Sequence, residues 1–132
     1  MLRIGLNPYG LTYHLGLQGM GTPRANPAGR GLEGFIAIAT ELKAEVIEIF
    51  DPWLRALDDD ALRALKDRLD SLGMVPVVSA GLNMMGPMES AFRSARALGA
   101  GVIRLGLSPV LCGARAEQGE KWGELIATIR AA

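Results

Sequence analysis

Short runs of apolar, often β-branched residues alternate along the chain with longer segments in which apolar residues recur every three or four positions. Three of these runs follow similar lead-ins, each reading as a helix end, a tight turn and a strand: residues 42–49, 72–78 and 98–105. Gly73 and Gly99 lie where the end of a helix favours a left-handed backbone. The strands begin near positions 46, 74 and 101, so the repeat of about 27 or 28 residues matches a compact strand–helix unit.

The segments between the runs have the period of amphipathic helices. Three aspartates at 58–60 precede the second helix, where acidic side chains suit the helix dipole. The buried faces that we expect are Phe35, Ile38, Ala39 and Leu42 in the first helix, Leu62, Leu65, Leu69 and Leu72 in the second, Met88, Phe92, Ala95 and Leu98 in the third, and Trp122, Leu125, Ile126 and Ile129 in the fourth.

The alternation within the strands distinguishes two kinds of parallel sheet. Ile47 and Ile49 oppose a face that carries Glu48, and Ile103 and Leu105 oppose a face that carries Arg104. The first strand likewise has one apolar face, formed by Leu2, Ile4 and Leu6, and one with Arg3, Gly5 and Asn7. A doubly wound sheet is apolar on both faces, whereas a barrel carries helices on its outer face and encloses a partly polar interior.

The pattern therefore favours an α/β fold of four consecutive βα units, forming half of a (β/α)₈ TIM barrel with parallel strands and helices on the outer face. We expect residues 1–132 to form a single, partial barrel domain. Pro76 is unusual inside a central strand, because it has no N–H to donate, and we expect it at a strand start or a local break.

Composition restricts the classes of function. The chain has 132 residues, of which 49% are hydrophobic, and its 14 basic residues balance 14 acidic ones. This balance gives no reason to expect binding to nucleic acid or to a membrane. Cys112 is the only cysteine, the first residues do not resemble a signal peptide, and no apolar run reaches the roughly 18 residues of a membrane span. We expect a cytoplasmic protein.

Two charged side chains fall on the expected barrel interior. Glu48 and Arg104 lie on alternate strands, which share layers in such barrels, so we hypothesise that they pair inside. Glu48 is the candidate catalytic carboxylate, suited to proton transfer, and Arg104 is a candidate substrate-binding residue. The alternative is a purely structural ion pair, since charges inside a protein must be paired.

The remaining substrate-binding candidates lie where strands end, on the face that carries the active sites of barrels. The first connection, from Pro8 to about Gly31, is long for a compact domain and contains His14, the only histidine. A lone loop histidine is more often plain surface. Asn7, Asp51 and Asn83 directly follow the first three strands, although Asp51 also suits a turn or cap before Pro52. The glycines at 16–21 lack the GK[ST] ending of a phosphate-binding loop.

The chain resembles the amino-terminal half of the sugar phosphate isomerase/epimerase family, the xylose-isomerase-like TIM barrels. The resemblance covers essentially the whole chain and is carried by residues 3–6, 45–49, 69–74 and 95–105. Its members are about twice as long as this chain. They typically bind a divalent metal (Mn, Mg, Co or Zn) through Glu, Asp, His and Glu on later strands, and move a proton beside a carbonyl.

The resemblance implies a partial sugar or sugar-phosphate isomerase or epimerase. Its metal would be bound in the second half of the barrel, so we expect no metal site in this chain, and no activity from this chain alone. A second enzyme function is an apurinic-site endonuclease of the same superfamily, which the single histidine and zero net charge oppose. A non-enzymatic alternative is a structural half-barrel that forms a homodimer through its open sheet edges.

Overall fold

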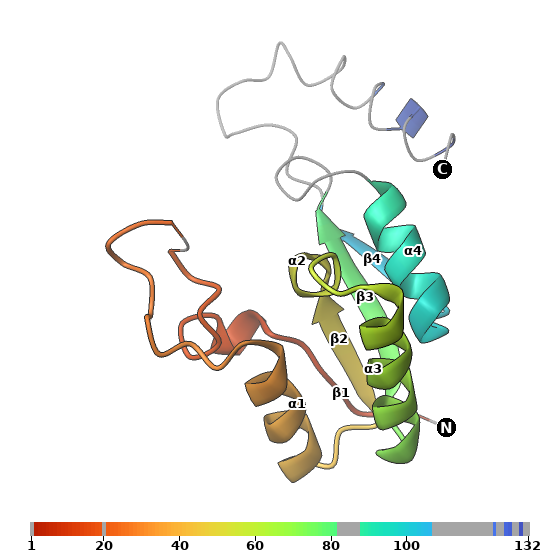
Figure 1. The fold of residues 1–132 in the computed structure, drawn as a ribbon, viewed down its shortest axis with the longest axis horizontal. Coiled ribbons are helices and arrows are strands. Elements are labelled where there is room, and N and C mark those ends of the chain that lie inside the picture. Colours follow the sequence, from red (N-terminus) through yellow and green to blue (C-terminus); the bar gives the residue numbers. More distant parts are fainter. Residues whose placement is uncertain are drawn as a thin grey trace.

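The computed structural model describes residues 2–19, 21–81 and 88–106, together with Gly123, Ile126, Ala127 and Arg130. The fold is α/β, with one parallel sheet of four strands in the order β1-β2-β3-β4 (Figure 1). Its elements are β1 (Gly5–Leu6), η1 (Tyr9–Leu11), α1 (Gly31–Glu41), β2 (Val46–Phe50), α2 (Asp51–Leu54), α3 (Asp59–Ser71), β3 (Val75–Gly81), α4 (Met88–Leu98) and β4 (Ile103–Gly106).

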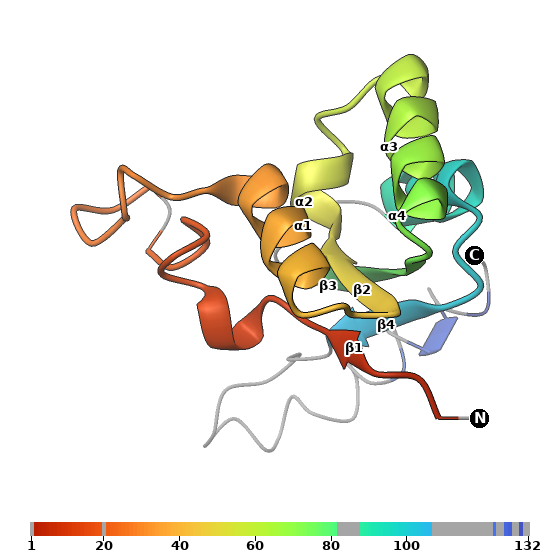
Figure 2. The ribbon, with the colours of Figure 1, turned by 90° about the horizontal axis from the view of Figure 1, so that it is seen from below.

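The helices cover one face of this sheet. Because each strand pairs with the next strand in sequence, right-handed crossovers bring every connecting helix to the same side. Figure 2 shows α1, α2, α3 and α4 on that side. Ile47, Ile49 and Val78 of the two central strands face the helices and are completely buried. Val46, Glu48 and Phe50 alternate with them and are only half-buried, so the sheet has one covered and one uncovered face.

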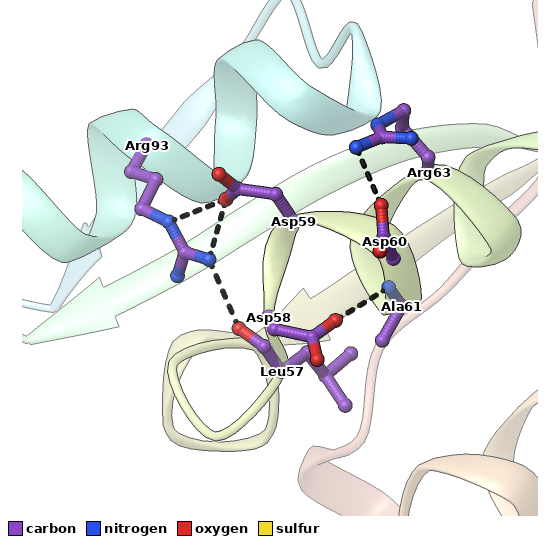
Figure 3. A network of polar contacts seen from close by, with 7 residues as sticks. All are labelled: Leu57, Asp58, Asp59, Asp60, Ala61, Arg63 and Arg93. Carbon is purple, nitrogen blue, oxygen red and sulfur yellow. Dashed lines mark hydrogen bonds and ion pairs between the residues drawn. The ribbon is translucent and has the colours of Figure 1, made fainter.

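Helix α3 forms where the leucine spacing predicts it. The carboxylate of Asp58 accepts a hydrogen bond of 2.8 Å from the backbone N–H of Ala61, which caps the amino end (Figure 3). Leu62, Leu65 and Leu69 are buried against the sheet. The helix ends before Gly73, whose φ of +69° is the left-handed conformation expected there.

Ion pairs join neighbouring helices across the outer layer. The Arg93 guanidinium of α4 donates to the Asp59 carboxylate of α3 at 2.7 Å and to the Leu57 carbonyl at 3.1 Å (Figure 3). Arg68 of α3 pairs with Glu33 of α1 at 2.6 Å. These pairs are exposed, so each contributes only about 0–1 kcal/mol, and helix packing depends mainly on the buried apolar faces.

Several predicted core positions are wrong. Leu42 and Leu72 are the C-cap residues of α1 and α3, and their side chains are 64% and 38% exposed because the chain turns away from the sheet there. Ile36 and Ala91 are buried instead, and Phe92 is half-buried. In the expected fourth helix Ile126 has helical conformation but is 46% exposed; Trp122, Leu125 and Ile129 lie outside the described residues.

The first strand is shorter than the sequence predicts. Only Gly5 and Leu6 pair as β1, and Leu2 and Ile4 are 97% and 76% exposed. The Ile4 carbonyl still accepts hydrogen bonds from the backbone N–H groups of Glu45 and Val46. β1 is an edge strand, and the part of the chain that the structure describes places no neighbour on its other side.

Pro76 lies within β3, paired with Ile47 and buried, without a break in register. The N–H of Val75 points towards β2 and that of Val78 towards β4, which places the nitrogen of Pro76 on the β4 side. Pairing with β4 begins only at Val78, so Pro76 removes no hydrogen bond from the ladder.

Candidate functional site

A hydrogen-bonded charge cluster lies on the uncovered face of the sheet. Arg104 of β4 donates from Nε and approaches from Nη2 the same oxygen, Oε1, of Glu48 in β2, at 2.7 Å in each case. Its Nη2 also donates to the Ser79 hydroxyl of β3 at 3.0 Å. The side chains of Arg104 and Glu48 are 39% and 15% exposed. The predicted pairing of Glu48 with Arg104 is therefore confirmed.

The strand register explains this contact. Arg104 stands beside Ser79, and Glu48 stands beside Val77, two residues earlier on the same face of β3. The long guanidinium side chain therefore reaches diagonally across β3 to a carboxylate one step nearer the amino ends of the strands. Ser79 is 5% exposed, and its hydroxyl satisfies a donor that would otherwise be left without a partner at the β3 crossing.

Tyr9 covers the guanidinium from the end of β1. The centre of its ring lies 5.1 Å from Cζ of Arg104, within the range of a cation–π contact, and the ring is otherwise 64% exposed. The pKa of Arg104 is raised above its usual value, chiefly by the hydrogen bond to Glu48 and next by Tyr9, against a smaller opposing effect of burial. The guanidinium thus remains charged at every physiological pH.

Asn7 is positioned beside the same cluster. Its Oδ1 accepts a hydrogen bond of 3.1 Å from the backbone N–H of Tyr9, an Asx-turn that starts η1 and directs Tyr9 over the sheet. Asn7 and Glu48 also line one hollow of about 210 Å³ on the uncovered face. Its other lining residues are Gly5, Leu6, Val46 and Val77. Three of the predicted site residues, Asn7, Glu48 and Arg104, are thus brought together.

His14 is exposed within the loop that follows η1, and it is not among the residues that surround Glu48. The contact that fixes its position is made by the backbone, where its carbonyl accepts from the N–H of Arg30 at 3.1 Å. Leu15, 2% exposed, anchors the loop in the core, and Asn26 donates to the Tyr13 carbonyl at 2.9 Å. These contacts hold the described part of the loop in place.

Asp51 faces the helices and lies apart from the charge cluster. It is 1% exposed and is the first residue of α2, directly before Pro52. The alternative role as a helix cap is wrong, because the N-cap is Phe50 and no side chain caps this helix. Its carboxylate pairs with Arg55 and accepts from the Ser90 hydroxyl of α4 at 3.3 Å. Asp51 thereby links α2 to α4 behind the sheet.

Asn83 lies outside the described residues. Among the residues that the structure does describe, no three His, Cys, Asp or Glu side chains come together as a metal site. No helix in the described part of the chain is both long and apolar enough to cross a membrane.

Ser79 and Tyr9 are the members of the cluster that sequence reasoning did not select. Ser79 continues the face of Val75 and Val77, so the alternation of β3 already carried a signal for it. Tyr9 begins the three-residue η1, a segment too short for any periodicity to indicate which way its side chain points.

A scan against protein-family models gives no match to this chain, and a search of curated proteins finds no significantly similar sequence.

Proposed function

We propose that the chain is half of a (β/α)₈ barrel. The support is its winding: four parallel strands follow one another in sequence order and their helices lie on one face. A doubly wound sheet reverses its strand order and places helices on both faces. A barrel keeps one winding direction, and its active site lies at the carboxyl ends of the strands.

We further propose that the uncovered face is one wall of the substrate site of a sugar or sugar-phosphate isomerase or epimerase. The observation that carries this proposal is the Glu48–Arg104 pair, hydrogen-bonded and partly exposed to solvent beside a hollow. A well-packed apolar pair would hold the sheet together at least as well as an ion pair. A carboxylate maintained there is suited to accept a proton from a carbon beside a carbonyl.

Each residue of the cluster has a role in this proposal. Glu48 is the proton acceptor, and Arg104 is a positioning residue that fixes the carboxylate through Oε1. Asn7 hydrogen-bonds a hydroxyl of the substrate, and Tyr9 shields the guanidinium from water. The described residues do not assemble the ligands of a divalent metal, so no step in this chain is assigned to one.

Two measurements test the proposal. Titration of the ¹⁵N-labelled chain with aldoses and ketoses should shift amide signals of residues 5–7, 46–48 and 104–105, and Glu48→Gln should weaken these shifts. Incorporation of solvent deuterium beside the sugar carbonyl, with Mn²⁺ present, should stay at background for this chain alone. A lack of binding by every sugar tested excludes the proposal, whereas turnover would show that the site is complete.

A second candidate function is a self-associating structural module. It is favoured by the exposed apolar side chains beside both open edges of the sheet: Leu2 and Ile4 before β1, and Val102 before β4. Unpaired edge strands are templates for pairing with another chain. Two copies related by a two-fold axis along the strands would place β4 of each beside β1 of the other with all strands parallel.

A further inference from the structure

The geometry points to an uncharged, polyhydroxylated ligand, a free sugar or polyol without a phosphate group, as the occupant of the hollow beside Glu48. This inference rests on the proposed function and narrows its substrate class. It follows from three observations: the charge balance of the uncovered face, the hydrogen-bonding groups of the hollow, and its size.

The charge balance opposes a phosphate. The described residues that line the hollow include no cation, and Arg104, which pairs with Glu48, already has Nε and Nη2 engaged with Glu48 and Ser79. A phosphate is bound by uncommitted cations or by converging N–H groups. Here it would instead meet the carboxylate of Glu48, a like charge at close range that opposes binding of any anion.

The hydrogen-bonding groups suit a hydroxyl. Oε1 of Glu48 is engaged with Arg104, so Oε2 is the oxygen that Glu48 has as an acceptor for a ligand; Asn7, whose Oδ1 is engaged with the Tyr9 N–H, has its Nδ2 group as a donor. A hydroxyl both donates and accepts, so it can satisfy the two side chains together. Leu6, Val46 and Val77 give the hollow apolar surface against which the C–H groups of a sugar ring or chain can pack.

The size of the hollow suits a small ligand. At about 210 Å³ the hollow is smaller than the roughly 300–1,000 Å³ of sites that hold drug-sized molecules. Gly5 contributes to this space, since a Cβ at that position would lie only 3.1 Å from Cβ of Val46. The described wall therefore matches a single small sugar in size.

The test compares ribose, ribose 5-phosphate and inorganic phosphate by NMR titration of the full chain. Ribose should shift the amides of residues 5–7, 46–48 and 77, ribose 5-phosphate should bind at least about tenfold more weakly, and inorganic phosphate should leave these signals unchanged. Glu48→Gln removes the repelling charge and leaves Arg104 uncompensated, so it should weaken ribose binding and strengthen phosphate binding. Glu41→Gln, an exposed carboxylate at the end of α1, is the charge-matched control.

A second variant covers the case in which Glu48→Gln does not fold. Asn7→Asp keeps the oxygen that accepts from the Tyr9 N–H but removes the N–H donor, and should weaken ribose binding roughly tenfold while phosphate stays excluded. Tighter binding of ribose 5-phosphate than of ribose would overturn the inference and leave the proposed function standing. If neither sugar bound at these residues, both would be lost.

Discussion

At the scale of single residues, the uncovered face shows how far strand alternation predicts a site. The alternation of side chains along β2 and β4 predicts that Glu48 and Arg104 lie on one face of the sheet. Because alternate strands of a barrel share layers, it also predicts their contact. The structure has that contact at 2.7 Å. Alternation does not predict how far β2, β3 and β4 are shifted along one another. This register places Arg104 beside Ser79 and so makes Ser79 the third member of the cluster.

The pair can be tested as a pair. Arg104→Met leaves Glu48, the more buried partner, without its counter-charge, and we expect a loss of about 1–2 kcal/mol in the free energy of unfolding. This figure lies below the 3–5 kcal/mol of fully buried pairs because solvent reaches Arg104. The double variant Glu48→Leu/Arg104→Met should be more stable than Arg104→Met alone, since no uncompensated charge remains. Urea unfolding of both single variants and the double variant measures the coupling; strictly additive losses would contradict it.

At the scale of elements, long amphipathic segments were predicted well and short ones were not. The leucine spacing and the aspartates at its start were sufficient to place α3, because burial of one face and capping agree there. The helix α2, four residues long, and the three-residue η1 are too short to show a period, so nothing predicted them. The predicted first strand is longer than β1, because alternation shows which residues suit a strand but not whether a neighbouring strand pairs with them.

The amino end of α3 offers a matched comparison between two neighbouring aspartates. Asp58 caps a backbone N–H, whereas Asp60 forms an exposed pair with Arg63 (Figure 3). We expect Asp58→Ala to lower the free energy of unfolding by about 1 kcal/mol, because the N–H of Ala61 loses its acceptor. Asp60→Ala should change it by no more than about 0.5 kcal/mol. Equal losses for the two variants in thermal or urea unfolding would show that the negative charge near the amino end, and not the capping hydrogen bond, stabilises α3.

At the scale of the whole molecule, the single winding direction leaves both sheet edges and one sheet face uncovered in the described part of the chain. Repeat spacing predicted the parallel sheet, and the polar residues on one face of the strands predicted the single winding direction of a barrel rather than a doubly wound sheet. The pattern of a single sequence does not predict what packs against the two edge strands of its sheet. The sites of greatest apolar exposure, Leu2 and Ile4, adjoin such an edge.

These edges lead to a prediction about association. If a second copy covers them, the chain should elute as a dimer by size-exclusion chromatography with light scattering. Ile4→Lys should then shift it towards monomer, because a charged side chain at an edge opposes strand pairing. The backbone contacts of Ile4 with Glu45 and Val46 do not involve its side chain, so the fold itself should persist. Leu42→Lys is the control: Leu42 is 64% exposed but is the C-cap residue of α1 and belongs to no strand, so its substitution should leave the dimer intact. A monomeric wild-type chain at all concentrations, or equal effects of the two lysines, would refute pairing through the edges. Aggregation without a defined dimer would instead indicate that these strands require partners other than a second copy.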